Sequence, residues 1–470
     1  ALPSPRALAA ERPPDCVGAP GEEPLGACGV PLTRSQAVAV AFAASRRCTL
    51  VRGPPGTGKT HTACAIIDSW LSCVPGCRVL VVTQSNAAAL NIHERLEVFG
   101  LPSARLGMQM RPEELVEQRY LASLLEPIEL QALRSAAEGE EPATPGLLMP
   151  VLQRAAKRAP VVVMTCISSG NAGLLGSCTF QRVLLDEAAQ ATEPTSLVPL
   201  MTRARAFACI GDDRQLPATV VSQGAKNRGL DESLFERLLR VGVVQENDGF
   251  VQLDVQRRMH STIADFPSRA FYGGRIENGC ADEDRPPVPG FCWPRDGAFR
   301  VCFVDCGGGG TEELRGTSTM NVGEAEILVN VLVGILDAHE GVGTQLEASD
   351  IAVITGYAAQ RELLRHQIHK STWRRHPARA VRVDTVDGFQ GMERELVFVS
   401  TTRSNSAGEV GFLRDARRTN VLLTRARRGL VVFGDARTLC REEEVWGPWL
   451  QWVDAHGAIV DGASLLGACG

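Results

Sequence analysis

The stretch Gly53-Pro-Pro-Gly-Thr-Gly-Lys-Thr60 constrains the fold of this chain more than any other part of the sequence. It fits the pattern GxxxxGK[ST], follows the apolar run 49–51 and precedes a helical pattern. Glycines allow backbone N–H groups to approach phosphate oxygens, and the start of a helix contributes the positive end of its dipole. A chance glycine turn is the weaker alternative, because strand, loop and helix all match. The sequence therefore predicts a phosphate-binding loop in an α/β domain.

Apolar strand-like runs alternate with helical patterns in two separate series along the chain. Alternation of this kind is typical of a parallel sheet with helices on both faces. The first series has expected strands at 48–52, 78–83, 161–165, 182–185 and 206–210, with helices at 59–71 and 86–98 between them. The second has expected strands at 299–304, 350–354, 382–384, 396–400 and 430–434. We therefore expect two similar α/β units.

The domain boundaries follow from changes in composition. Residues 1–31 are rich in proline and glycine and predict a linker or arm, and residues 461–470 predict a tail. The two units are expected over 32–245 and 246–460. A polar helical insertion is expected at about 108–159, with helices over 112–125, 126–137 and 148–158. The chain begins with Ala1 instead of Met, which suggests a piece of something longer or a processed protein.

A pair of carboxylates follows the apolar strand 182–185. Asp186 is a candidate for the Mg²⁺ shell together with Thr60, and Glu187 is a candidate for polarising an attacking water. A strand that ends in Asp-Glu is by itself an ordinary surface edge. Mg²⁺ takes only one or two carboxylates besides phosphate oxygens, so no larger acidic cluster is expected.

Six ordered stretches resemble the motifs of superfamily-one helicases, in the group that contains the nonsense-mediated-decay helicase and the immunoglobulin-mu-binding helicase. Besides the phosphate loop, the stretches that carry this resemblance are Leu32-Thr-Arg-Ser-Gln36, Asp186-Glu-Ala-Ala-Gln190, Gly211-Asp-Asp-Arg-Gln215-Leu-Pro217, Gln256-Arg-Arg258-Met-His260, Asp384-Thr-Val-Asp-Gly-Phe-Gln390-Gly-Met-Glu393 and Asn420-Val-Leu-Leu-Thr-Arg425. Several motifs in the family's order are far more specific than any single one.

The resemblance implies two tandem RecA-like P-loop domains with ATP and Mg²⁺ in the cleft between them. Arginines from the second domain would then stabilise the transition state only when the domains close. The catalytic residues implied are Lys59, Thr60, Asp186, Glu187, Gln215, Arg258 and Arg425, with Thr60 and Asp186 at the metal. The nucleotide contacts implied are Gln36, Gly53, Pro54, Pro55, Gly56, Thr57, Gly58, Lys59, Thr60, His61, Gln256, Arg257 and Glu393. No catalytic group of the family is missing, so we expect an active ATPase.

Polar residues at the ends of expected strands are candidates for gripping the backbone of a single strand. They are Ser85, Asn86, Thr165, Thr355, Tyr357, Gln360, Thr385 and Val386. Helix capping is an equally good explanation for several of them. The function implied is an ATP-dependent helicase or translocase that unwinds RNA or DNA duplexes, with RNA weakly favoured. An ATP-gated RNA clamp, an RNP remodeller and a coactivator module of a larger multidomain protein remain alternatives.

A basic stretch lies between residues 361 and 382. It has seven Lys or Arg against one acid, Glu362, and it includes Trp373 and three histidines. The stretch could contribute an electrostatic footprint with a stacking aromatic, or it could be a solubilising helix and loop. The net charge of the whole chain is −5, so any nucleic-acid site must be local.

The remaining composition bears on the cellular environment. The 15 cysteines show no CxxC pair, which favours reduced thiols in an intracellular protein, cytoplasmic or nuclear. No run approaches the roughly 18 apolar residues of a membrane span, so no membrane partner is expected. Protein partners are expected if the chain belongs to a larger protein.

Overall fold

The computed structural model describes residues 29, 31–107, 110–139, 144–176, 178–307, 310–339 and 346–467, which form two compact units. Unit 1 contains the chain up to Asp213 together with Pro217–Asp254, and unit 2 contains Arg214–Leu216 and the chain from Val255 onward. The predicted linker at 1–31 lies almost wholly outside the described residues. The chain changes units at 254/255 instead of the expected 245/246, because strand β8 (Gly249–Gln252) still pairs within the first sheet.

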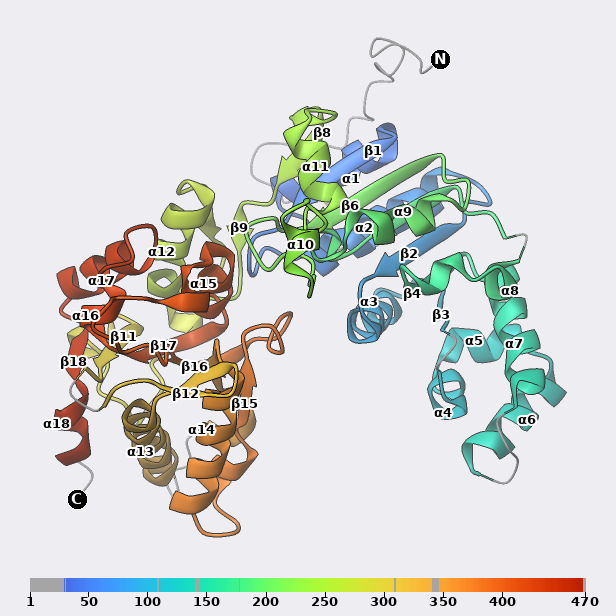
Figure 1. Cartoon of the computed structure of the whole chain (residues 1–470). Coiled ribbons are helices and arrows are strands. Elements are labelled where there is room, and N and C mark those ends of the chain that lie inside the picture. Colours follow the sequence, from blue (N-terminus) through green and yellow to red (C-terminus); the bar gives the residue numbers. More distant parts are fainter. Residues whose placement is uncertain are drawn as a thin grey trace. The chain divides into compact units, whose positions relative to one another are not determined.

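Unit 1 is built on an eight-stranded sheet in the order β3-β4-β2-β5-β6-β1-β8-β7, and neighbouring strands run parallel (Figure 1). Its strands are β1 (Cys48–Arg52), β2 (Val79–Thr83), β3 (Ser103–Arg105), β4 (Val161–Thr165), β5 (Arg182–Leu185), β6 (Ala206–Gly211), β7 (Gln245–Glu246) and β8. Its helices are α1 (Arg34–Ser45), α2 (Lys59–Cys73), α3 (Asn86–Val98), α4 (Pro112–Val116), α5 (Arg119–Leu124), α6 (Pro127–Ala137), α7 (Pro145–Arg158), η2 (Ser168–Gly170), α8 (Ala172–Leu175), η3 (Ala188–Gln190), α9 (Glu193–Leu200), α10 (Gln223–Lys226) and α11 (Leu234–Arg240).

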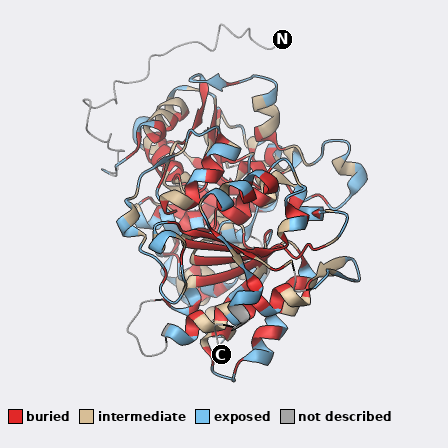
Figure 2. Ribbon diagram, turned by 90° about the vertical axis from the view of Figure 1, so that its left-hand side faces the viewer, coloured by how far each residue is buried: buried red, intermediate tan, exposed pale blue. Residues whose placement is uncertain are grey.

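The sheet of unit 1 separates two apolar clusters, as parallel sheets covered on both faces require. One cluster packs Ile66 and Trp70 of α2 against the sheet, and the other includes Phe180, Phe235 and the helical insertion. The inner strands of the two large sheets are drawn as buried, while the helices alternate between buried and exposed residues (Figure 2). Burial on both faces explains why these strands appear in the sequence as continuous apolar runs.

The insertion between β3 and β4 is helical, but the prediction of a single helix over 112–125 was wrong. The structure divides it into α4 and α5 at Gln118, whose backbone is extended. The Gln118 side chain bonds both backbone groups of Arg105: Oε1 accepts from its N–H at 2.7 Å, and Nε2 donates to its carbonyl at 3.0 Å. These buried bonds tie the insertion to the edge strand β3 and offset the lost helical bonds.

Unit 2 is built on a six-stranded parallel sheet in the order β15-β14-β16-β17-β11-β18. The strands of this sheet are β11 (Val301–Asp305), β14 (Ile351–Thr355), β15 (Arg382–Thr385), β16 (Arg394–Ser400), β17 (Ala426–Gly434) and β18 (Ile459–Asp461). Two separate two-stranded sheets of unit 2 pair β9 (Val255–Gln256) with β10 (Glu277–Asn278) and β12 (Glu313–Arg315) with β13 (Ser318–Met320). Its helices are α12 (Ser261–Tyr272), η4 (Asp282–Asp284), η5 (Arg295–Gly297), α13 (Val322–His339), η6 (Ala348–Asp350), α14 (Ala358–Ser371), η7 (Pro377–Ala380), η8 (Gly411–Arg414), α15 (Ala416–Leu423), α16 (Ala436–Leu439), α17 (Trp446–Ala455) and α18 (Gly462–Gly467).

The two parallel sheets with flanking helices confirm the predicted fold class, which is a pair of RecA-like α/β domains with a helical insertion in the first. The strands that the sequence did not predict are short or lie at sheet edges, as β3 and β18 do, where few apolar residues mark them. Within the part of the chain that the structure describes, every helix is too short or too polar to cross a bilayer.

Candidate nucleotide and nucleic-acid site

The predicted phosphate loop joins β1 to α2 in unit 1. Gly56 and Gly58 have φ of 77° and 80°, a region that glycine enters without steric cost. Lys59 is the first residue of α2, and its Nζ donates to the carbonyl of Gly53 at 2.8 Å. A Cβ at Gly53 would lie 2.1 Å from Cγ of Lys59, so this glycine makes room for the lysine. The loop is therefore shaped around the Lys59 side chain.

The loop is anchored to the end of the neighbouring strand β6. The backbone N–H of Gly53 donates to the carbonyl of Gly211 at 2.8 Å. A Cβ at Gly211 would lie 2.8 Å from the backbone nitrogen of Ala189, in the turn after β5. The carboxyl ends of three neighbouring strands, β5, β6 and β1, therefore converge beside the loop, the place where open parallel sheets bind ligands.

Asp186 and Glu187 lie at this convergence. Asp186 is buried, and Glu187 has φ of 53°, which is strained for a residue with a side chain. Nε2 of Gln190 donates to Oε2 of Glu187 at 2.6 Å and orients that carboxylate. Burial and the charge of Glu187 raise the pKa of Asp186, whereas the nearby Lys59 ammonium lowers it. The structure thus brings together Lys59, Asp186 and Glu187, three of the predicted catalytic residues.

Gln36 and His61 flank the loop from the other side. Nε2 of Gln36 donates to the carbonyl of Thr57 at 3.1 Å, and Oε1 accepts from the N–H of Thr33 in a capping box. Ring nitrogen Nε2 of His61 lies 3.2 Å from the carbonyl of Pro31. Both residues lie beside the predicted loop, and Gln36 also belongs to the capping box of α1, a role that the sequence analysis did not predict for it.

Arg258 of unit 2 is held by a carboxylate and a carbonyl. It pairs with Glu393, and its Nη1 donates to the carbonyl of Thr424 at 3.1 Å. Burial would raise the pKa of Glu393, but the guanidinium groups of Arg258 and Arg427 outweigh it and hold that pKa below its ordinary value. Arg258 and Glu393, predicted for different roles, therefore form one charged cluster.

Arg425 is only 2% exposed, and its guanidinium is fixed by several oxygens. Nε donates to the carbonyl of Val421 at 2.9 Å, and Nη2 donates to Oε1 of Gln215 at 3.0 Å and to Oγ1 of Thr424 at 3.0 Å. Gln215 belongs to the short segment that packs with unit 2. The structure thus brings two further predicted catalytic residues, Gln215 and Arg425, into direct contact.

Gln256 was predicted to contact nucleotide, and the structure corrects this. Its Oε1 accepts from the N–H groups of Arg258 and Met259, each at 2.8 Å. Its Nε2 donates to the carbonyl of Met259 and to Oδ1 of Asn278, each at 2.8 Å. The amide is fully buried and all its bonding capacity is used, so Gln256 positions the backbone of Arg258. Arg257, by contrast, is exposed.

Some of the predicted nucleic-acid contacts are accessible. Ser85 and Asn86 are exposed at the start of α3, where Oγ of Ser85 also caps the helix by accepting from the N–H of Ala88 at 3.1 Å. Thr165 and Thr385 are partly exposed at the ends of β4 and β15. Asn86 and Thr165 line one cavity of about 380 Å³ together with Arg105.

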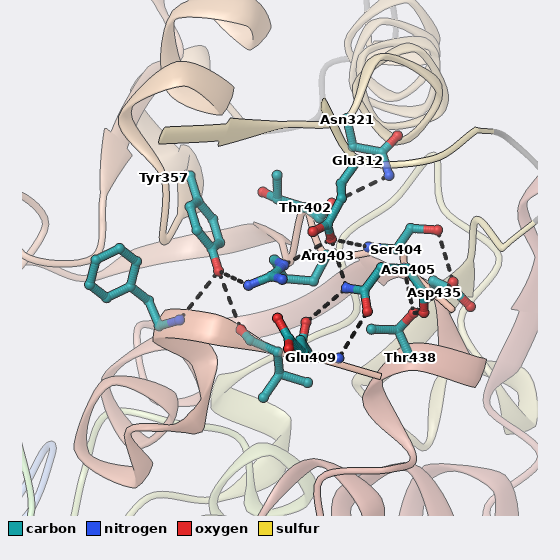
Figure 3. Close-up of polar contacts among 12 residues, drawn as sticks. Glu312, Asn321, Tyr357, Thr402, Arg403, Ser404, Asn405, Glu409, Asp435 and Thr438 are labelled. Carbon is teal, nitrogen blue, oxygen red and sulfur yellow. Dashed lines mark hydrogen bonds and ion pairs between the residues drawn. The ribbon is translucent and has the colours of Figure 1, made fainter. Parts of the chain in front are cut away.

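Four other predicted contacts are buried, and the structure corrects their role. They are Thr355, Tyr357, Gln360 and Val386. The hydroxyl of Tyr357 donates to the carbonyl of Val410 at 3.3 Å and accepts from Arg403 at 3.2 Å, within a polar network of unit 2 (Figure 3). Nε2 of Gln360 donates to Oγ of Ser400 at 3.0 Å. Segments distant in sequence cover these side chains, which strand ends alone did not reveal.

The same network contains a buried glutamate that the sequence reasoning missed. Glu324 is fully buried near the start of α13, and its carboxylate accepts from Oγ of Ser400 and from the N–H of Thr402 at 2.9 Å. Oδ1 of Asn321 accepts from the N–H of Glu324 at 3.0 Å. Asn followed three residues later by Glu, ahead of an apolar run, is a helix-start signal that could have identified the pair.

Glu324→Gln is expected to flatten the dependence of the free energy of unfolding on pH. Burial raises the pKa of Glu324 to about 8, although bonds from Ser400 and Thr402 lower it. Because the folded-state pKa lies above the unfolded one, this group's contribution to stability is complete below pH 4.5 and is lost as pH rises through about 8. Urea unfolding of both chains at pH 5.5 and 8 measures the effect. An equal pH slope in both chains would contradict it.

Two models of the AAA domain match this chain, over residues 31–133 with 129–223 and over 230–437. The relatives include the Arabidopsis thaliana protein "Regulator of nonsense transcripts 1 homolog", 34% identical over 93% of this chain and 35% of that protein. The Saccharomyces cerevisiae "ATP-dependent helicase NAM7" is 34% identical over 92% of this chain and 44% of that protein. The Dictyostelium discoideum "Regulator of nonsense transcripts 1" is 32% identical over 92% of this chain and 33% of that protein.

This chain therefore spans between a third and a half of the length of these relatives. Among solved structures, the Arterivirus nonstructural protein 10 helicase aligns with 86% of this chain and 65% of its own, at 17% identity and a TM-score of 0.40. The matched AAA domains and the relatives cover both units. The chain therefore carries two matches to the AAA domain, and its relatives support the predicted resemblance to the superfamily-one helicases of the nonsense-mediated-decay group.

Proposed function

We propose that this chain is an ATP-dependent helicase or translocase, which moves on single-stranded nucleic acid and unwinds RNA or DNA duplexes. The observation that carries the proposal is the convergence of Lys59, Asp186 and Glu187 at one edge of the unit 1 sheet. The relative named an ATP-dependent helicase, which matches over 92% of this chain, supports the same activity.

The residues of unit 1 fit ATP with Mg²⁺. Glycines such as Gly56 and Gly58 allow backbone N–H groups to approach phosphate oxygens, and Lys59 places one positive charge at the loop. Thr60 and Asp186 would hold Mg²⁺, which neutralises charge on the phosphates when bound. Among the described residues no group of three or more His, Cys, Asp or Glu is arranged to hold a metal ion by itself, and Mg²⁺ on a nucleotide needs none. Glu187 would orient the water and accept its proton.

Arg258 and Arg425 are proposed to stabilise negative charge on the γ-phosphate during hydrolysis, and Gln215 to respond to that phosphate. Their support is the resemblance together with the fixed guanidinium of Arg425, which contacts Gln215 directly. A preorganised cation loses little entropy when charge develops near it. Gln36, His61 and Glu393 are proposed nucleotide contacts on the same grounds.

The exposed strand ends in each unit are proposed to grip the sugar–phosphate backbone. Ser85, Asn86 and Thr165 would do so in unit 1, and Thr385 in unit 2. Hydroxyls, amides and backbone N–H groups suit contact without sequence preference. Two relatives are named for nonsense transcripts, which favours RNA over DNA here. A cytoplasmic or nuclear location and protein partners in a larger chain remain predictions.

The test is ATP hydrolysis with matched single-stranded RNA and DNA, followed by displacement of a labelled strand from a partial duplex. We expect single-stranded RNA and DNA each to stimulate hydrolysis, with the stronger effect from RNA. We also expect displacement of the labelled strand to require ATP. Stimulated hydrolysis without displacement would favour the ATP-gated clamp or remodeller. A chain without any hydrolysis would overturn the proposal and favour the coactivator module.

A further inference from the structure

The basic stretch between 361 and 382 does not form one surface beside Thr385, at the edge of the unit 2 sheet that is proposed to grip the strand. Helix α14 carries the chain away from that edge by about 20 Å, since it has 14 residues at about 1.5 Å each. At its near end, Arg361 pairs with Asp384 of β15. Beyond its far end lies the loop before η7, in the orange part of unit 2 (Figure 1).

An exposed tryptophan and three cations gather at this far end, here called the Trp373 patch: Lys370, Trp373, Arg374 and Arg375. Trp373 is 55% exposed, whereas the other tryptophans of the described chain are buried or partly buried. From residue 363 to 383 the sequence contains no Asp or Glu. Among the described residues, no carboxylate pairs with the three cations of the patch. The three cations of the patch are therefore not neutralised by direct ion pairs.

The loop that carries Trp373 is rigidly held from beneath. Nη2 of Arg379 donates to the carbonyls of His369 and Thr372, both at 2.7 Å, which closes the end of α14. The N–H of His376 donates to the carbonyl of Trp373 at 3.0 Å in a turn. An aromatic side chain held in this way loses little conformational entropy when it binds a ligand.

His376 fixes the indole itself. Its ring contacts that of Trp373 at a centroid distance of 4.4 Å and an interplanar angle of 88°. Nδ1 of His376 accepts from the N–H of Ala378 at 3.1 Å, so Nε2 carries the proton that bonds Oδ1 of Asp337 at 2.9 Å. The buried imidazole is thus locked on two sides and supports the tryptophan. An exposed aromatic ring held in one orientation offers a flat face on which a base can stack.

We propose that the Trp373 patch is a second nucleic-acid site, at which an unpaired base stacks on the indole while Lys370, Arg374 and Arg375 contact phosphates. Fixed aromatics among cations are the combination that single-strand binding uses, and stacking contributes about 1–3 kcal/mol per base. The choice of nucleic acid over an acidic protein segment rests on the proposed function. The site lies at the far end of α14, away from the sheet edge of unit 2 that is proposed to grip the strand. It would hold a long strand at a second point.

The test compares the binding of oligonucleotides to the full wild-type chain and to a double variant that carries Arg374→Glu and Arg375→Glu. For a single strand of 40 nucleotides, we expect the Kd to rise about tenfold and the slope of log K against log salt to fall by about 1.4, the value for two lost phosphate contacts. For a strand of 4 nucleotides the Kd should stay the same, because at about 3.4 Å per stacked nucleotide that strand is shorter than the roughly 20 Å that α14 spans between the two places. Single-stranded RNA and DNA are both measured.

The matched control is Arg203→Glu with Arg205→Glu, two exposed arginines of unit 1 with the same change in charge. The proposal would be overturned if both double variants lost the same affinity for the strand of 40 nucleotides. It would also be overturned if neither variant lost affinity. Saturating ATP hydrolysis should persist in the Arg374→Glu, Arg375→Glu variant. A chain that never hydrolyses ATP but still shows the length-dependent loss would overturn the proposed function and leave this site intact.

Fluorescence of Trp373 provides a second readout. A single-stranded oligonucleotide should quench part of the tryptophan emission of the wild-type chain, and Trp373→Leu should abolish that part. Quenching by a polyglutamate peptide but not by either nucleic acid would overturn the proposal in favour of an acidic protein partner. Unchanged quenching in Trp373→Leu would also overturn it.

Discussion

Lys59→Ala is expected to reduce the turnover of ATP hydrolysis by at least about a hundredfold. The lysine supplies positive charge at the phosphate loop, and the loss of one such preorganised group from a transition-state site costs about that much. Within the described part of the chain its ammonium bonds only the carbonyl of Gly53, so the variant should remain folded. Steady-state hydrolysis with saturating single-stranded RNA measures turnover, and circular dichroism measures the fold.

The matched control is Lys157→Ala, which removes an exposed lysine from α7 of the same unit. This variant should hydrolyse ATP at the wild-type rate. A folded Lys59→Ala chain with wild-type turnover would remove the basis for the phosphate loop assignment. A Lys157→Ala chain with reduced turnover would show that the assay responds to surface charge in general.

The local parts of the candidate site could be predicted from the sequence because they are continuous. The phosphate loop needs only Gly53–Thr60 between a strand and a helix, and Asp186 directly follows an apolar strand. The same holds for the alternating strands of both sheets. In each case neighbouring residues determine the conformation, and the parallel order then brings distant strand ends to one edge.

The buried polar network could not be predicted, because its partners are distant in sequence. Tyr357 looked accessible at the end of β14, yet its hydroxyl lies against Val410 and Arg403. Gln256 resembled a nucleotide contact, yet Asn278 uses its remaining donor. A polar residue at a strand end can serve a ligand or a turn, and only the fold decides between them.

Glu187→Gln is expected to lower the turnover of ATP hydrolysis by about a hundredfold or more while KM for ATP changes little. A positioned general base contributes about 10²–10⁴-fold to a rate, and glutamine cannot accept the proton of the attacking water. The substitution keeps the shape and one oxygen, which can still accept from Nε2 of Gln190. A turnover loss without a KM change separates chemistry from nucleotide binding.

The strained backbone of Glu187 offers a second explanation for this residue, a role in the turn alone, which the same experiment tests. Its φ of 53° lies in the left-handed region, where a residue with a side chain costs of order 1–3 kcal/mol. Glu193→Gln is the matched control, because Glu193 lies six positions further on and pairs with Arg237 at the surface. That control should retain full turnover and lose at most about 1 kcal/mol of stability. If Glu187→Gln also hydrolysed ATP at the wild-type rate, the strain would serve the turn alone, and the water-activating base would have to be sought elsewhere.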